Sequence, residues 1–199
     1  TFPDRNMRYN FYDYTTRQWN WIDPDHMQDG VNVFSERSGF GVADAASAGR
    51  VSVVASTASG LVLARDGTPG AGVLDYSYGP VGYYWPDMSI GDDGTYHIAM
   101  SSGYELSYTR VDTSGTWDSV RTLASTPFLA YAIDAGKAAP SVCAAFIDDG
   151  HMFYLLSENR GDTWSSAVEI EPPPAFGGDT VTAFSNSGLF AFIDRQARL

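Results

Sequence analysis

The sequence contains a single cysteine, Cys143, so no disulfide can form within the chain. The residues around it are apolar, and this setting predicts a buried, unreactive thiol. Basic residues are also few, since 12 Lys and Arg stand against 24 Asp and Glu and give a net charge of −12. Such a chain is repelled by polyanions, which argues against nucleic acid or an anionic membrane surface as a partner.

Long apolar runs and helical patterns are missing as well. No stretch of about 18 apolar residues is present, so no membrane insertion is predicted. We find no apolar stripe with the period and length of an α-helix. Aromatic residues are plentiful, with 12 Tyr, 11 Phe and 5 Trp, and they suit half-buried pleated surfaces. The composition therefore favours an all-β protein.

The composition also bears on location. The acidic balance and the abundance of Ser, Thr, Gly and Tyr are typical of an exported bacterial protein, so an extracellular or cell-surface location is expected. No signal peptide is present, and a chain that starts at Thr1 is expected to be processed or cut from a larger protein.

The clearest motif is the stretch from Ser157 to Trp164, which reads Ser-Glu-Asn-Arg-Gly-Asp-Thr-Trp. An Asn at a hairpin tip can accept hydrogen bonds from backbone N–H groups further along the turn. A Gly supplies the left-handed conformation that such a turn needs. A weaker copy runs from Asp112 to Trp117, with its Gly displaced by one position. The motif residues of the two copies are Ser157, Asn159, Gly161, Thr163 and Trp164, and Asp112, Gly115, Thr116 and Trp117.

These motifs belong to a repeat. The positions equivalent to Trp164 are Trp19, Ala71 and Trp117, at spacings of 52, 46 and 47 residues. The motif tryptophans, together with Trp21, are predicted to lie in the core. A second series of short strands starts near Asp44, Asp87, Asp134 and Asp179, at spacings of 43, 47 and 45 residues.

Two strands from each series give four antiparallel strands per repeat, which is the pattern of a β-propeller blade. Continuous repeats are predicted at residues 40–80, 84–125 and 129–171. The two ends of the chain each supply half of such a repeat. Residues 7–22 are predicted to form the two outer strands of a blade, and residues 176–197 the two inner strands. Together they are expected to make a fourth blade, split between the two ends of the chain.

Closure of that split blade is left open by the sequence. The two end segments can join within one molecule, which gives a four-bladed ring. They can also join between two molecules as a swapped homodimer, which gives an eight-bladed ring with two-fold symmetry. In a third arrangement the chain is a piece of a longer propeller.

The stretch from Ser157 to Trp164, supported by the copy at Asp112 to Trp117, resembles the Asp-box (BNR-repeat) β-propeller superfamily. This superfamily includes sialidases and secreted bacterial propeller modules. The resemblance implies a single β-propeller domain with four blade equivalents over residues 1–199, and it says little about chemistry.

An enzymatic role is the alternative that the resemblance raises. Sialidase-like catalysis implies an arginine triad, a Tyr nucleophile with a Glu partner, an Asp acid/base and a Phe-Arg-Ile/Leu-Pro element near the start. That element is absent, and Arg65, Arg110 and Arg160 lie at motif turns. We therefore expect a non-catalytic recognition or scaffold module with an unknown protein or glycan partner, and a glycan-acting hydrolase of sialidase-like fold is the alternative.

The once-per-repeat aspartates are the candidate binding site. Asp44, Asp87, Asp134 and Asp179 start the innermost strands, which line the central channel of a propeller. Carboxylates held close together raise one another's pKa unless a cation compensates. Such a ring would suit Ca²⁺ or a cationic ligand group. The other interpretation is that each Asp begins a strand after a loop and is simply solvated; no cofactor is otherwise expected.

Overall fold

The computed structural model describes residues 5–25, 29–46, 49–125 and 130–171, and every regular element in these ranges is a β-strand. None of the described residues therefore forms a helix that could cross a membrane. The strands are β1 (Arg8–Tyr9), β2 (Tyr12–Asp13), β3 (Gln18–Trp19), β4 (Val31–Asn32), β5 (Ser38–Ala45), β6 (Val51–Thr57), β7 (Gly60–Asp66), β8 (Leu74–Tyr78), β9 (Tyr84–Ile90), β10 (Tyr96–Ser102), β11 (Glu105–Val111), β12 (Arg121–Ser125), β13 (Tyr131–Ala135), β14 (Val142–Asp148), β15 (His151–Ser157) and β16 (Val168–Ile170).

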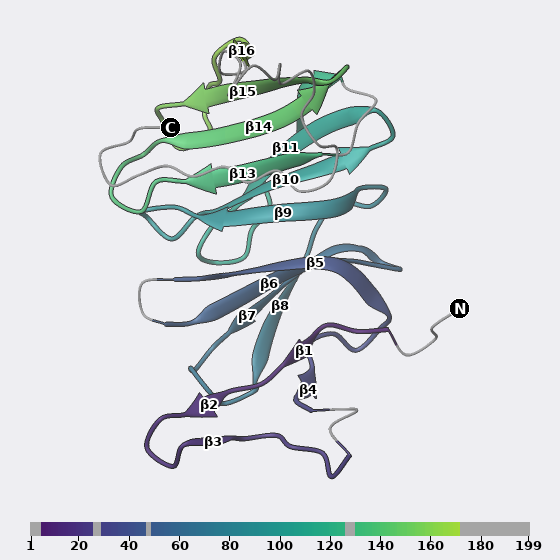
Figure 1. Cartoon of the computed structure of the whole chain (residues 1–199), viewed down its shortest axis with the longest axis vertical. Coiled ribbons are helices and arrows are strands. Elements are labelled where there is room, and N and C mark those ends of the chain that lie inside the picture. The colour runs from purple at the N-terminus through teal and green to yellow at the C-terminus, as the bar shows by residue number, and fades with distance from the viewer. Residues whose placement is uncertain (1–4, 26–28, 47–48, 126–129, 172–199) are drawn as a thin grey trace, which may run out of the picture. The chain divides into compact units, whose positions relative to one another are not determined.

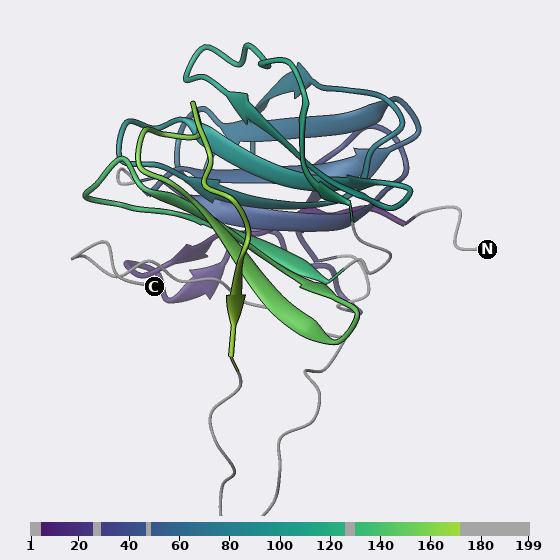
Figure 2. The ribbon, with the colours of Figure 1, turned by 90° about the horizontal axis from the view of Figure 1, so that it is seen from above.

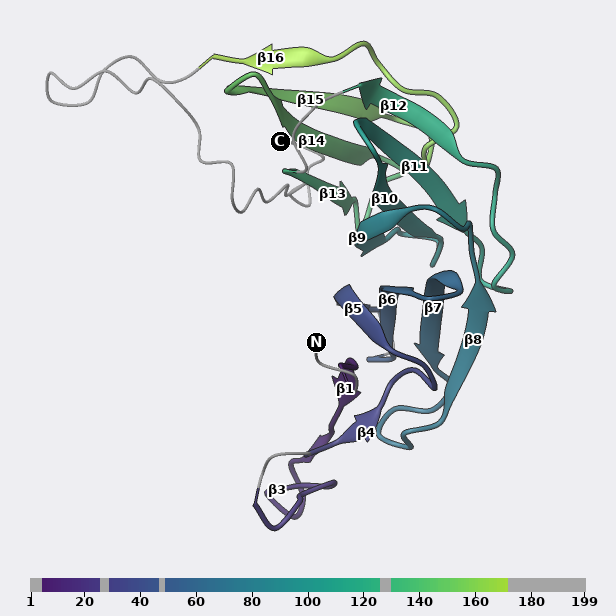
Figure 3. The same ribbon diagram turned by 90° about the vertical axis from the view of Figure 1, so that its right-hand side faces the viewer.

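The first compact unit, Thr1–Pro86, contains one four-stranded antiparallel sheet with its strands in the chain order β5-β6-β7-β8 (Figures 1 and 3). Two short ribbons precede this sheet, because β1 pairs with β4 and β2 pairs with β3. Met7 and Tyr9 pack against a buried cluster that joins the ribbon to the sheet. The buried members of this cluster are Val33, Phe34, Val53, Ala55, Val62 and Ala64.

The second unit, Asp87–Leu199, contains two four-stranded antiparallel sheets, and β9 begins three residues before it. Their strand orders are β9-β10-β11-β12 and β13-β14-β15-β16 (Figure 3). The long green strands β14 and β15 lie side by side in Figures 1 and 2. Residues from both sheets share one core, which contains Ala99, Leu106, Tyr108, Ile133, Ala135, Val142, Phe146 and Leu155.

Burial explains the composition of the central strands. Six of the seven residues of β10 and six of the seven of β14 are buried. A strand covered on both faces reads as a near-continuous apolar run instead of an alternation. Cys143 lies in β14 with 1% of its surface exposed, and burial raises the pKa of its thiol to about 12. The prediction that this thiol is buried is therefore confirmed.

Tight turns set the register of the hairpins. Asp149 and Gly150 connect β14 to β15 with φ values of 46° and 80°. Positive φ at both central residues is characteristic of the two-residue turn whose twist matches that of the flanking strands. Asp148 then pairs with His151 across the turn.

The all-β prediction is confirmed for the described residues, in antiparallel sheets of two to four strands. The three larger sheets span residues 38–78, 84–125 and 131–170, where repeats were predicted at 40–80, 84–125 and 129–171. Within the predicted hairpin at 7–22, β2 pairs with β3. The predicted inner pair at 176–197 lies outside the described residues.

One core prediction is wrong. The side chain of Trp19 is 52% exposed, although its ring contacts that of Tyr12 edge-on at a centroid distance of 5.4 Å. A two-stranded ribbon offers only one neighbouring strand for packing. Trp21, Trp117 and Trp164 are half-buried.

Candidate functional site

The turn from Ser157 to Trp164 is closed by its own side chains. The Oδ1 atom of Asn159 accepts hydrogen bonds from the Thr163 backbone N–H at 2.9 Å and from the Ser157 hydroxyl at 2.9 Å. The Asn159 amide nitrogen donates to the Thr163 hydroxyl at 2.9 Å, and the Gly161 N–H donates to Ser157 Oγ at 2.8 Å. Gly161 has a φ of 81°, which few other residues adopt.

The second turn uses the same device. The Oδ1 atom of Asp112 accepts hydrogen bonds from the backbone N–H groups of Ser114 at 2.9 Å and Thr116 at 2.8 Å. The Ser114 hydroxyl also donates to this carboxylate, and these bonds lower the pKa of Asp112 below its ordinary value. Gly115 has a φ of 94°. In both copies, therefore, the motif residues build a turn and lie within it.

A buried pair lies beneath the Asn159 turn. His97 Nδ1 and the Tyr108 hydroxyl are 2.7 Å apart, and each side chain is 1% exposed. The Tyr108 ring meets the ring of Trp164 edge-on at a centroid distance of 4.9 Å. A Cβ atom added at Gly161 would lie 2.7 Å from Cζ of Tyr108, so the turn fits onto this ring only with glycine.

Burial also changes the ionisation of this pair. Loss of hydration lowers the pKa of His97 to about 4, so the imidazole is neutral at neutral pH. The same cause raises the pKa of the Tyr108 hydroxyl above its ordinary value. Both groups are therefore uncharged at neutral pH.

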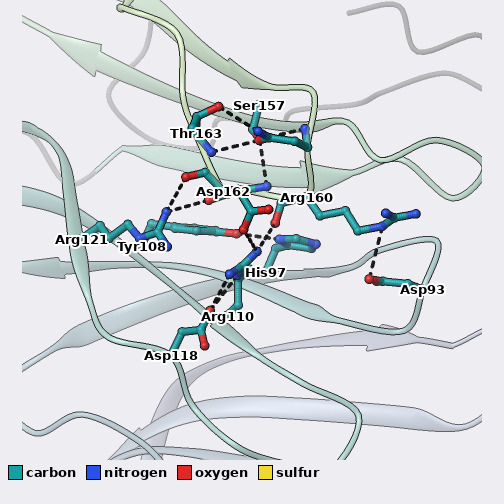
Figure 4. Close-up of polar contacts among 12 residues, drawn as sticks. Asp93, His97, Tyr108, Arg110, Asp118, Arg121, Ser157, Arg160, Asp162 and Thr163 are labelled. Atoms are coloured by element: carbon teal, nitrogen blue, oxygen red, sulfur yellow. Dashed lines mark hydrogen bonds and ion pairs between the residues drawn. The ribbon is translucent and has the colours of Figure 1, made fainter.

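Arginines surround the turn (Figure 4). The Arg110 guanidinium donates to Asp118 Oδ2 at 2.8 Å, to Asp162 Oδ1 at 2.6 Å and to the Arg160 carbonyl at 2.9 Å. Arg121 donates to the carbonyl of Asp162 at 2.8 Å. These bonds attach the turn before β16 to β11 and β12 of the neighbouring sheet.

Arg160 connects the same turn to the loop between β9 and β10. Its guanidinium forms two hydrogen bonds with Asp92, at 3.0 Å and 2.8 Å, and lies 3.2 Å from Asp93. The hydrogen bonds from Arg160, together with its charge, lower the pKa of Asp92 below its ordinary value. An open polar cleft of about 330 Å³ lies among these groups, and it is lined by Asp93, Thr95, Arg110, Asp112, Asp118, Asn159, Arg160 and Asp162. Its arginines are already paired with carboxylates, and the ion pairs with Asp162 and Asp92 connect the neighbouring sheets.

The aspartates of the inner strands make a different set of contacts. Asp87 Oδ2 accepts a hydrogen bond from the Ile133 backbone N–H at 2.9 Å. Two residues further along β9, the Ser89 hydroxyl donates to Asp134 Oδ1 at 2.9 Å and accepts from the Ala135 N–H at 3.0 Å. These bonds join β9 of one sheet to β13 of the next.

Lys137 adds to this connection, since its ammonium group donates to the Ile90 carbonyl at 2.7 Å. Asp44 is half-buried on β5 and accepts a hydrogen bond from the Ala45 N–H at 2.7 Å. Asp179, the fourth member of the predicted ring, lies outside the described residues. Of the predicted site residues, the structure thus places Asp87 and Asp134 on strands β9 and β13, which the bonds of Asp87 and Ser89 connect.

The described ranges contain no group of three or more His, Cys, Asp and Glu side chains placed to hold a metal ion. The two carboxylate oxygens of Asp87 accept hydrogen bonds from the backbone N–H groups of Ile133 and Met88. This arrangement of oxygens fits hydrogen bonding between strands better than Ca²⁺ coordination, which needs six to eight oxygen ligands.

Sequence reasoning missed the connecting residues Ser89 and Lys137 and the buried pair of His97 and Tyr108. For Ser89 a signal was present, because an Asp and a Ser two residues apart point to the same side of a strand. For His97 the signal is its place within the apolar run of β10.

Comparison of the chain with protein-family models found no matching family. A comparison with curated proteins likewise found no match.

Proposed function

We propose that the chain is a non-catalytic recognition or scaffold module with a β-propeller architecture of four blade equivalents. The observation that carries this proposal is that two candidates for a channel site form hydrogen bonds between neighbouring sheets. Asp87 accepts from the Ile133 N–H and Asp134 accepts from the Ser89 hydroxyl. A carboxylate that accepts a structural hydrogen bond is held in place, which suits a connector better than an acid/base catalyst.

The arginines support the same proposal. Sialidase-like binding of a substrate carboxylate needs guanidinium groups that face the ligand. Arg110 and Arg160 instead pair with Asp118, Asp162 and Asp92 at the motif turns. Within the described ranges these side chains serve the attachment of one sheet to the next.

Three sheets of four antiparallel strands in chain order support the propeller proposal, because this is the internal order of a propeller blade. On this proposal residues 7–22 and 176–197 complete the fourth blade, within one chain or between two copies. Light scattering on the purified chain distinguishes one copy from two. An extracellular or surface location of a bacterial protein follows from the composition as part of the proposal.

A screen with fluorogenic glycosides, including a sialoside, tests the non-catalytic role. We expect no turnover above that of the heat-denatured protein. Turnover that is lost in Asp87→Ala but kept in Asp44→Ala would overturn the proposal and favour a glycan-acting hydrolase.

A cation at the inner-strand aspartates is tested separately, by the melting temperature with Ca²⁺ and with a chelator. The connector role of Asp87 predicts equal melting temperatures in the two conditions. A Ca²⁺-dependent increase that Asp134→Asn removes would show that the aspartates hold the ion.

A further inference from the structure

An exposed group of aromatic rings lies in the first unit. Phe40, Tyr84 and Trp85 are 54%, 51% and 39% exposed. The centroids of the Phe40 and Trp85 rings are 5.7 Å apart at an interplanar angle of 69°. Those of Tyr84 and Trp85 are 5.9 Å apart at 59°. We call these three residues the aromatic platform.

The backbone holds two of these rings in an unusual conformation. Phe40 has a φ of 52° and Trp85 a φ of 50°. Bulky residues rarely adopt this left-handed region, and backbone strain of this kind is concentrated at functional sites. Two strained residues whose side chains meet at the surface thus indicate that the position of the rings is functionally important.

A β-bulge produces the conformation at Phe40. The register of β5 against β6 shifts between Gly39 and Val42, where an extra residue stands in β5. A bulge re-aims a side chain, and here it leaves Phe40 exposed. The glycines on both sides permit this, because a Cβ at Gly39 would lie 2.9 Å from the Arg5 guanidinium and one at Gly41 would lie 3.1 Å from Met7.

Charge narrows the class of ligand. The guanidinium carbon of Arg5 lies 4.5 Å from the centroid of the Phe40 ring, so a positive charge lies against one ring of the platform. This charge repels a cationic ligand, and the net charge of −12 disfavours an anionic one. An uncharged ligand remains.

The exposed area of the platform restricts the class of ligand further. A fully buried aromatic side chain covers roughly 150–250 Å², so three half-exposed rings offer roughly 200–400 Å². A stable protein interface needs about 800 Å² on each partner. The platform is too small for a folded protein partner and matches a few sugar rings. The C–H groups of a pyranose ring are attracted to the negative face of an aromatic ring.

We propose that the aromatic platform of Phe40, Tyr84 and Trp85 binds a neutral oligosaccharide by stacking of its pyranose rings. This inference rests on the proposed recognition function and names its ligand class and its site.

The test measures binding of cellohexaose, xylohexaose, mannohexaose and laminarihexaose to the whole chain at millimolar concentration, by tryptophan fluorescence and calorimetry. The variants are Phe40→Asn and Trp85→Asn, because Asn tolerates the left-handed conformation and removes only the ring. Tyr104→Asn is the matched control, since Tyr104 is 74% exposed outside the platform. Circular dichroism establishes that each variant is folded.

We expect at least one saccharide to bind, and each platform variant to weaken binding about tenfold, which corresponds to the loss of one aromatic contact of about 1.4 kcal/mol. The control should bind like the unaltered chain. Two results would overturn the proposal: no saccharide binds, or one binds equally to all variants. If a saccharide is hydrolysed and the platform variants still weaken its binding, the proposed non-catalytic function is wrong and the proposed binding site is supported.

Discussion

Acidification should destabilise the second unit through His97. The imidazole is 1% exposed and its Nδ1 lies 2.7 Å from the Tyr108 hydroxyl. Its pKa is about 4 in the folded chain against an ordinary value of 6.5. Since the pKa is lowered on folding, the unfolded chain takes up a proton first as the pH falls. Stability is therefore complete above pH 6.5 and is lost progressively between pH 6.5 and about 4.

The size of this loss follows from the difference between the two pKa values. One pKa unit corresponds to about 1.4 kcal/mol, so the shift of His97 from 6.5 to about 4 is equivalent to about 3 kcal/mol of unfolding free energy. The charged groups that act on the imidazole are Asp92, Asp93, Arg110 and Lys137. The carboxylates whose pKa is lowered, Asp13, Asp92 and Asp112, start from 3.8 and act mainly at lower pH.

The assay is urea unfolding at a series of pH values from neutral to about 4. His97→Gln should be less stable than the unaltered chain at neutral pH because the packing against Tyr108 is altered. Its unfolding free energy should nevertheless fall by about 3 kcal/mol less across the acidic range. His151→Gln is the control, since His151 is exposed and pairs with Glu169. Equal pH dependence in His97→Gln and the unaltered chain would refute the reasoning.

Two further predictions concern the turn and the connector. Gly161→Ala should lower the unfolding free energy by more than about 2 kcal/mol, because it combines left-handed strain with overlap onto the Tyr108 ring, whereas Gly103→Ala, at a φ of 63° in open space, should cost only about 1–2 kcal/mol. Equal losses in urea titrations would contradict the close approach. Asp87→Ala should cost about 1–3 kcal/mol by leaving the Ile133 N–H without this acceptor, and Asp87→Asn should recover most of the loss. An Asn variant as unstable as the Ala variant would count against the hydrogen bond.

The fold class could be read from the sequence because it depends on local patterns. Turn residues such as Asn159 and Gly161 form their hydrogen bonds within a few positions of the chain. Alternating and buried apolar runs then define the strands between turns. These signals do not require knowledge of which sheet faces which.

The site was harder to predict because its contacts are distant in the sequence. The role of Asp87 depends on Ile133, which is 46 residues away, and the sequence alone suggested a cation ring. Phe40 was missed because its exposure depends on a bulge, for which the two flanking glycines were the available signal. Trp19 was assigned to the core from its motif position, although its ribbon provides little cover.

The hydrogen bonds that join Asp87 and Ser89 to β13 also bear on how the number of sheets in such a chain can increase. Both connecting side chains lie within one tripeptide of a repeat, and their acceptor and donor partners are mostly backbone groups that almost any sequence supplies. A gene duplication that copies one repeat would therefore copy the means of attachment along with the sheet, so the number of sheets can change in evolution without a new interface having to arise.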